Sequence, residues 1–249
     1  MVEADAPAQH DMKEVSASGR VAPEWTDALL AAALLAVDPP GLGGAVLRAN
    51  AGPVRDRWME EFRSLISGDT PLRRVPSHTG DERLLGGLDL AATLKAGRPV
   101  LDRGILADVD GGVLIVPMAE RMAAALAARL VHVMDRREVA IERDGIAARI
   151  ETRFGVIALD EGIEVDERAP APLMDRLAFH LDLSALPYRL ATPGWFSRPE
   201  IETARQRLST VVVPDSVIVS LCTVAVACGI GSLRAPMLAL AAARAAAAL

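Results

Sequence analysis

The segment GGVLIVPMAE, residues 111–120, constrains the fold of this chain more than any other. Its four aliphatic residues, Val113 to Val116, are mostly β-branched; they follow a Gly-Gly pair and precede a helix-forming run. A short, continuous apolar run of this kind is typical of a strand buried on both faces of a parallel sheet. The chain is therefore predicted to be an α/β protein built around this strand.

The composition favours the same class. Apolar residues make up 51% of the chain but aromatic residues only 3%, so the core must consist of Ala, Leu, Val and Ile. Alanine-rich helices packed closely on a sheet fit this composition better than a β-sandwich does. The net charge of −6 argues against a general nucleic-acid binder, because neutralising a phosphate backbone requires a surplus of Lys and Arg.

Cysteine and histidine usage gives no sign of a metal site. Cys222 and Cys228 lie in an apolar run with helical character and are predicted to be two buried thiols. The histidines have no metal-ligand spacing. The longest aliphatic run, residues 28–37, is too short to span a bilayer, and the acidic amino terminus has no secretory pattern. We expect a cytoplasmic protein without a transmembrane segment.

Gly and Pro residues divide the chain into three parts. Residues 1–22 are polar and unpatterned, and are predicted to be a flexible tail. Residues 23–190 are predicted to form the α/β domain. Residues 191–249, which Pro residues break into wholly helical pieces, are predicted to be a smaller helical lid domain that is truncated.

Within the α/β domain, apolar periodicity and turn residues predict the individual elements. Helices are expected at 24–37, after the loop 48–54, within 82–112, and from Met118 through Leu130. Strands are expected at 45–47, 113–116, 154–159 and 177–183, with a hairpin over 138–150 that turns at Asp144-Gly145.

The loop after the first strand is where a phosphate cradle would lie, since glycines let backbone N–H groups turn inward and a lysine reaches the outer phosphates. The chain has ANAGPVRD at residues 49–56. Against the pattern GxxxxGKS/T, Ala49 and Val54 replace the glycines, Arg55 the lysine and Asp56 the metal-binding hydroxyl. Gly52 remains, but Pro53 removes an N–H donor. Nucleotide binding by this degenerate P-loop is predicted to be weak or absent.

The end of the central strand lacks acids as well. In nucleotide-hydrolysing folds an acid at this point holds Mg²⁺, but Pro117 and Met118 stand here. Either the strand is plain core or the metal-holding chemistry has been lost. The acidic loop 160–168 has no EF-hand spacing and is predicted to be solvated. A small-molecule enzyme using Asp160 and Glu161 as acid and base stays an open alternative.

Taken in order, four segments resemble the AAA+ subunits of magnesium chelatase, which insert Mg²⁺ into protoporphyrin IX at the entry to chlorophyll and bacteriochlorophyll synthesis. They are ERLLGGLDLAATLKAGRPVLDRGILADVDGGVLIV (82–116), VAIERDGIAARIETRFGVIAL (139–159), PLMDRLAFHLDL (172–183) and GSLRAPMLALAAARAAAAL (231–249). The chain departs from the ATPase subunit of that family at 49–56, 117–118 and 160–161. It therefore resembles the D-type subunit, and specifically its amino-terminal AAA+ portion.

The resemblance implies a P-loop-type AAA+ sheet flanked by helices and followed by the smaller helical domain. By position, Arg176 in LMDR matches an arginine finger that acts in trans, and Arg234 in GSLRA matches a sensor-2 arginine. The hairpin at Asp144-Gly145 matches the insertion before sensor 1.

The implied function is that of a non-hydrolysing platform. Such a subunit forms a hexameric-type ring with the ATPase (I-type) subunit and serves the porphyrin-binding H-type subunit, so that ATP drives Mg²⁺ insertion. ATP and Mg²⁺ are bound at the partner subunit, and no cofactor is bound by this chain. The alternative from the enzyme class is a self-sufficient MoxR-like AAA+ ATPase with an atypical P-loop.

Overall fold

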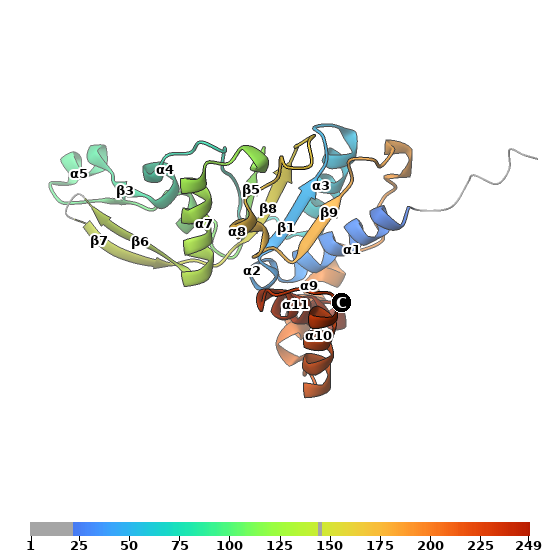
Figure 1. Cartoon of the computed structure of the whole chain (residues 1–249). Helices are drawn as coiled ribbons and strands as arrows, with labels where there is room; N and C mark the ends of the chain where they lie inside the picture. The colour runs from blue at the N-terminus through green and yellow to red at the C-terminus, as the bar shows by residue number, and fades with distance from the viewer. Residues whose placement is uncertain (1–21, 144–145) are drawn as a thin grey trace, which may run out of the picture.

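The computed structural model describes residues 22–143 and 146–249, and they form an α/β fold (Figure 1). A five-stranded parallel sheet lies at its centre, with the strand order β2-β5-β8-β1-β9. Its strands are β1 (Gly44–Arg48), β2 (Leu72–Arg74), β5 (Val113–Val116), β8 (Gly155–Asp160) and β9 (Phe179–Asp182). The central strand predicted at 113–116 is β5, and all four of its residues are buried.

The parallel register gives the sheet two distinct edges. Strand β1 pairs in parallel with β8 (Leu47 opposite Leu159) and with β9 (Leu47 opposite Leu181). Strand β5 pairs with β8 in the same sense. All carboxyl ends therefore lie at one edge of the sheet, here called the carboxyl edge, and all amino ends at the opposite amino edge.

Each face of the sheet carries its own apolar core, because side chains alternate between the faces along each strand. One face packs on α1 (Pro23–Val37) and α3 (Pro53–Leu65), and α9 (Arg198–Arg207) and α11 (Arg234–Ala248) join this core through α1. The other packs on α6 (Gly104–Asp108), α7 (Ala124–Arg136) and α8 (Ala171–Met174). Burial on both faces explains why the three central strands, β1, β5 and β8, are largely continuous apolar runs, whereas β2 and β9 at the ends of the strand order are only partly buried.

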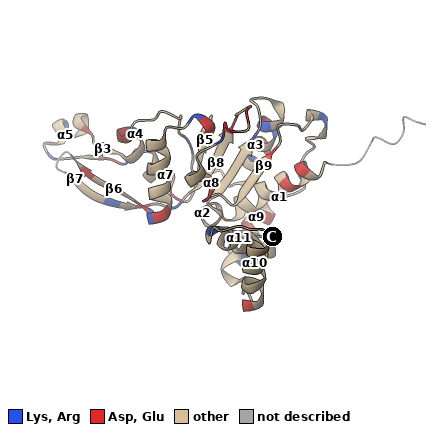
Figure 2. Ribbon diagram, in the orientation of Figure 1, with Lys and Arg blue, Asp and Glu red and all other residues tan. Residues whose placement is uncertain are grey.

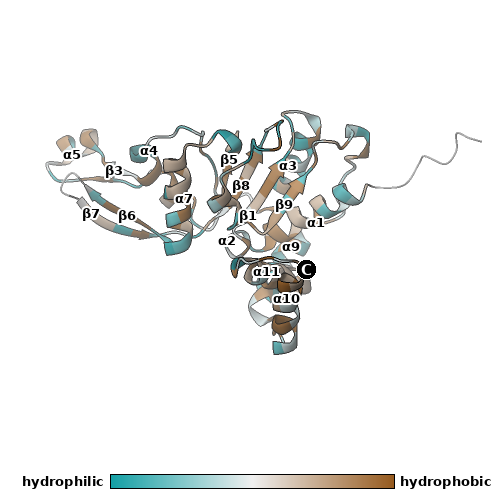
Figure 3. Cartoon of the chain, viewed as in Figure 1, coloured by the Kyte–Doolittle hydropathy of each residue, from teal (hydrophilic) through white to brown (hydrophobic). Residues whose placement is uncertain are grey.

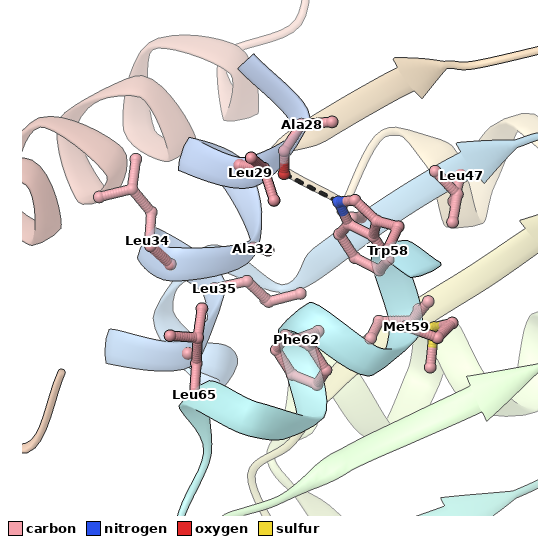
Figure 4. Close-up of a cluster of buried hydrophobic side chains, with 14 of the residues drawn as sticks. Ala28, Leu29, Ala32, Leu34, Leu35, Leu47, Trp58, Met59, Phe62 and Leu65 are labelled. Atoms are coloured by element: carbon pink, nitrogen blue, oxygen red, sulfur yellow. Dashed lines mark hydrogen bonds between the residues drawn. The ribbon is translucent and has the colours of Figure 1, made fainter. Parts of the chain in front are cut away.

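Helix α1 ends where Asp38 and the two prolines begin the short helix α2 (Pro39–Leu42). Its alanines let α3 approach closely, and Trp58 of α3 fills the interface (Figure 4). The indole Nε1 of Trp58 donates a hydrogen bond of 2.8 Å to the carbonyl oxygen of Ala28 (Figure 4). Its ring also stacks on Phe62 with a centroid distance of 6.0 Å.

Two adjacent glycines, Gly43 and Gly44, open β1 at the amino edge. Both have positive φ angles, of 67° and 137°. A Cβ atom on Gly43 would lie 2.0 Å from the carbonyl oxygen of Arg176, and one on Gly44 would lie 1.8 Å from that of Val156. Only glycine permits both the conformation and the close backbone approach.

Residues 81–108 differ from the single predicted helix. They form three short helices, α4 (Asp81–Leu85), α5 (Leu90–Ala96) and α6, and the two-residue strands β3 (Gly87–Leu88) and β4 (Leu101–Asp102). Glycines with positive φ, Gly86, Gly97 and Gly104, end or begin these pieces. A positive φ departs from the right-handed helical backbone, so these glycines divide the run into short pieces.

This region and the predicted hairpin project together from one end of the sheet (Figure 1). The hairpin is β6 (Glu138–Arg143) and β7 (Ile146–Glu151), paired with Val139 opposite Ile150, which confirms the antiparallel pairing. Its turn residues, Asp144 and Gly145, and the predicted tail at residues 1–21 lie outside the described residues.

The helix expected from Met118 starts later. Met118 has a φ angle of 48°, a short 3-10 turn η1 covers Ala119–Arg121, and α7 begins only at Ala124. Pro117 and the left-handed Met118 prevent a direct passage from β5 into the helix. The apolar period was continuous across this break because the 3-10 turn keeps Met122 against the core.

The carboxy-terminal helices attach to the α/β part through α9 and α11. Trp25 donates from Nε1 to the carbonyl oxygen of Thr192 at 2.8 Å, and Arg205 donates to that of Ala36 at 2.8 Å. Helix α10 (Asp215–Ala227) instead stands away from the sheet (Figure 1). Among residues 22–143 and 146–249, no single helix is long and apolar enough to cross a bilayer; only the bent pair 198–210 and 215–227, at 105°, passes by length and composition together.

The prediction of two buried thiols is wrong, because Cys222 and Cys228 are both exposed. Helix α10 is apolar along most of its length (Figure 3), yet only Ala225 within it is buried. An apolar run indicates burial only when another element covers it, and within the described chain α10 packs mainly against α11. Val219, Val224 and Val226 are exposed for the same reason.

The Trp58 contact generates a stability prediction. Trp58→Ala should lower the free energy of unfolding by about 3–5 kcal/mol, because it leaves a cavity between α1 and α3. Trp58→Phe should cost about 1 kcal/mol, since it removes the hydrogen bond to Ala28 but keeps the stacked ring. Urea unfolding followed by far-UV circular dichroism measures both. Trp195→Ala, at a site that is 53% exposed, is the control and should change stability little.

Candidate functional site

The degenerate P-loop lies at the carboxyl edge, as the order of elements predicted. Residues 49–52 join the end of β1 to Pro53, the first residue of α3. The N–H of Ala49 donates 3.0 Å to the carbonyl oxygen of Asp160, so the loop starts by following β8 rather than by opening into a cradle. Pro53 has no N–H to offer at the helix start, where an anion would otherwise be bound.

Arg55, which aligns in the sequence with the phosphate-binding lysine of the P-loop pattern, is already paired with a carboxylate. Its Nη1 donates to Oε1 of Glu161, and its Nε lies 3.7 Å from Oδ1 of Asp56. The Arg55 side chain is only 16% exposed. A nucleotide phosphate at this place would have to displace Glu161 and would also meet the carboxylate of Asp56.

A buried ion pair between the ends of β1 and β8 organises the acidic loop. Arg48 and Asp160 are direct neighbours in the strand register, with Nη1 3.4 Å from Oδ1 and side chains 11% and 2% exposed. Arg48 also donates 2.9 Å bonds to the carbonyl oxygens of Glu164 and Glu167. Asp160 in turn accepts from the N–H groups of Gly162 and Ala169.

The backbone of the acidic loop 160–168 is therefore held by hydrogen bonds to Arg48 and Asp160, while most of its side chains face solvent. Figure 2 shows its acidic residues gathered beyond the end of β8. The N–H groups of Ile163 and Glu164 donate to the Glu167 carboxylate and hold its pKa below the ordinary value. Sequence reasoning missed Arg48; a lone arginine at the end of an otherwise apolar strand was the available signal.

The end of β5 provides no metal-holding acid at residues 117–118. The nearest carboxylate along the chain is Glu120 in η1, and its Oε2 accepts a 2.9 Å bond from the N–H of Glu161. In the described ranges, 22–143 and 146–249, no group of three or more His, Cys, Asp or Glu side chains could hold a metal ion. Asp160 and Glu161, the alternative acid and base pair, are both engaged by arginines of this chain.

Together these contacts do not fit a nucleotide polyphosphate. Both arginines of residues 48–56 are paired with carboxylates of the acidic loop. Asp56, Glu120 and Glu161 would place negative charge around the phosphates, and like charges in a partly buried site repel strongly. The positive charges of Arg48 and Arg55 are therefore already neutralised by carboxylates of this chain.

The two arginines that the resemblance singles out lie at the amino edge instead. Arg176 follows α8 and precedes β9, and its backbone touches the turn at Gly43. Arg234 is the first residue of α11. The structure brings these two arginines together, and it places them at the edge of the sheet opposite to the loop 49–56.

Both arginines converge on one carboxylate, Asp135, in the last turn of α7. Arg176 binds it in a bidentate pair, with Nε 2.9 Å from Oδ1 and Nη2 on Oδ2, while its Nη1 donates to the carbonyl oxygen of Pro172. Arg234 reaches the Oδ1 of Asp135 at 3.4 Å and the Oδ2 of Asp175 at 3.2 Å. We call Asp135, Asp175, Arg176 and Arg234 the amino-edge cluster.

Within this cluster each charged group stabilises the charged form of its partner. The hydrogen bond from Arg176 is the main cause that holds the pKa of Asp135 below its ordinary value, and the same contact raises the pKa of Arg176. A cavity of about 200 Å³, lined by Arg137, Arg176, Arg234 and Asp135 among others, opens beside the pair. Asp135 had no signal in the sequence, because it sits in the charged run MDRRE without a motif.

The two ion pairs of the carboxyl edge, Arg48–Asp160 and Arg55–Glu161, should contribute differently to the free energy of unfolding. Arg48→Ala should lower the free energy of unfolding by about 3–5 kcal/mol, because it leaves Asp160 buried without its partner. Arg55→Ala should cost about 1 kcal/mol or less, since water can reach Glu161, which is 27% exposed. Urea unfolding of both variants tests this. Equal losses would contradict the assignment of Arg48 as the organising residue.

The chain has relatives among known proteins. It is 44% identical over 224 residues to the magnesium-chelatase 60 kDa subunit of Cereibacter sphaeroides, covering 90% of this chain and 37% of that subunit. It is 40% identical to the 60 kDa subunit of Rhodobacter capsulatus, over 86% of this chain and 35% of the relative. The chain therefore spans about a third of the length of these relatives. No protein-family model matches it.

Two solved structures show the fold. The crystal structure of a Cytophaga hutchinsonii protein aligns with a TM-score of 0.59 at 13% identity, over 90% of this chain and 78% of the other. A model of the complex between subunits BchI and BchD of magnesium chelatase, based on cryo-EM, aligns with a TM-score of 0.50 at 18% identity, over 91% and 95%. The expected AAA+ sheet with following helices is confirmed. Because sequence and fold agree over nine-tenths of its length, the chain belongs to the magnesium-chelatase 60 kDa subunit family.

Proposed function

We propose that this chain is a non-hydrolysing AAA+ platform of magnesium chelatase. It assembles in a ring with the ATPase subunit and transmits the ATP cycle of that subunit to the insertion of Mg²⁺ into protoporphyrin IX. Mg²⁺ is a substrate of the complex here, and this chain makes no bonds itself. The observation that carries the proposal is the pairing of Arg55 with Glu161 where a working member of the family binds phosphate.

Charge and geometry support the proposed absence of hydrolysis. Phosphoryl transfer requires a cradle of N–H donors, a cation on the outer phosphates and an acid that holds Mg²⁺. In this chain α3 begins with Pro53, which has no N–H to donate, and Arg55 is already paired with Glu161. Pro117 and Met118 follow β5 in place of an acid. Each of these parts supplies orders of magnitude in rate, so their joint loss leaves no reason to expect turnover.

The partners are proposed from the relatives. The cryo-EM model pairs subunits BchI and BchD, so the neighbour of this chain is proposed to be the I-type ATPase, which supplies ATP and its Mg²⁺. The porphyrin-binding H-type subunit receives the conformational change. The complex is proposed to work in the cytoplasm, without nucleic acid.

Arg176 is proposed to act on the nucleotide of the neighbouring subunit. It lies at the amino edge, away from this chain's own degenerate loop, so it cannot serve its own carboxyl edge. Its planar guanidinium suits the charge that develops on a γ-phosphate in transfer. Arg234, the proposed sensor-2 arginine, shares the same cluster.

We expect the isolated chain to bind no fluorescent ATP analogue at micromolar concentrations, because Arg55 and Asp56 replace the lysine and the hydroxyl. Fluorescence titration measures this, with the intact ATPase subunit as the positive control. Saturable micromolar binding, together with ATP turnover by the isolated chain, would instead support the MoxR-like ATPase.

Arg176→Ala should leave the chain folded and able to assemble, but should lower both partner-stimulated ATP hydrolysis and chelation. Arginine fingers contribute roughly 10³ to 10⁵ in rate where they act. Arg176→Lys should rescue little, because lysine lacks the planar fork. Arg73→Ala is the matched control: Arg73 is exposed on β2, the strand at the opposite end of the sheet order from β9. Wild-type activities for Arg176→Ala would refute the assignment.

A further inference from the structure

We infer that Asp135 is a positioning residue for two arginines, Arg176 and Arg234, and that its main ion-pair partner can change from Arg176 to Arg234. When Arg176 turns to the phosphate of a neighbouring nucleotide, Asp135 closes on Arg234 and tightens the start of α11. The inference rests on the proposed function only for what draws Arg176 away; the exchange itself is a property of this chain.

The first step is that Arg176 is held, not free. Its Nε and Nη2 form a fork on both oxygens of Asp135, and its Nη1 donates to Pro172, so its side chain is only 15% exposed. The fork is also the part of a guanidinium that binds a phosphate bidentately. A phosphate must therefore compete with Asp135 for Arg176, because both use the same donors.

The second step is that Asp135 needs a cation from some source. It lies in the last turn of α7, where the helix dipole places partial negative charge and a carboxylate is unfavourable. Arg176 offsets this charge at close range, whereas Arg234 contributes only from 3.4 Å. If Arg176 leaves, Arg234 is the cation that already touches the abandoned carboxylate.

The third step is that Arg234 gains from the exchange. As the first residue of α11 it places a positive charge at the positive end of that helix. Asp175, which also accepts a 2.6 Å bond from Ser232, offsets part of this charge at 3.2 Å. A closer Asp135 would offset more of it and stabilise the first turn of α11. The nucleotide state of the neighbour would thus reach the carboxy-terminal helices of a chain that binds no nucleotide.

Hydrogen exchange of the isolated full chain tests the exchange of partners. The readout is the amide exchange of residues 238–241, whose N–H groups close the first turns of α11. Arg176→Ala removes the competitor for Asp135, so exchange there should slow roughly two- to fivefold, the size of one charge contact at a helix end. Arg176→Gln, which keeps more of the side chain, should act in the same direction.

Two further variants test whether Asp135 is the cause of the slower exchange. Asp135→Asn should speed the exchange of residues 238–241, and the double variant with Arg176→Ala should lose the slowing seen in the single one. Arg73→Ala should match the wild type. If Arg176 were merely a structural brace, its removal would loosen α11, so faster or unchanged exchange in both Arg176 variants would overturn the inference.

The reconstituted complex separates this inference from the proposed function. Adding ATP to the complex with the I-type subunit should slow the exchange of residues 238–241 as Arg176→Ala does in the isolated chain. A response in the isolated variants without an ATP response in the complex would refute the trans role of Arg176 and leave the carboxylate exchange standing.

Discussion

The parallel pairing of β1 with β8 on one side and β9 on the other is the constraint on which both sites depend. It brings Arg48 opposite Asp160 at the carboxyl edge, so that the end of β1 is bound to the acidic loop. It also brings the turn before β1 against Arg176, which lies between α8 and β9, at the amino edge. One sheet thereby holds two separate arginine–carboxylate sites at opposite ends of its strands.

The two edges use arginine in different ways. At the carboxyl edge Arg48 is nearly buried and makes its contacts within the chain, so its role is to hold the loop. At the amino edge the carboxylate of Asp135 is 35% exposed and serves two arginines. Buried pairs are costly to break, whereas partly exposed pairs rearrange at little cost. The ion pairs of the amino-edge cluster should therefore rearrange at a lower cost than the Arg48–Asp160 pair.

The central strands could be predicted from the sequence because they are buried on both faces and form continuous apolar runs, as β5 and β8 do, whereas the partly exposed β2 was missed. Residues 81–108 could not, since their short pieces are set by glycine conformation and not by period. The exposure of α10 was equally hidden, because an apolar run does not tell whether another element covers it. Arg176 and Arg234 were found only through the family resemblance, and Asp135 emerged only from tertiary contacts.

The glycine pair that opens β1 has a consequence for natural variation. Gly43 lies so close to the carbonyl oxygen of Arg176 that even an alanine would push the two backbone segments apart. Such a change would leave every polar group of the amino-edge cluster in place and still move the point from which the guanidinium extends. A missense variant at Gly43 would thus displace Arg176 relative to Asp135 without removing any functional group of the cluster.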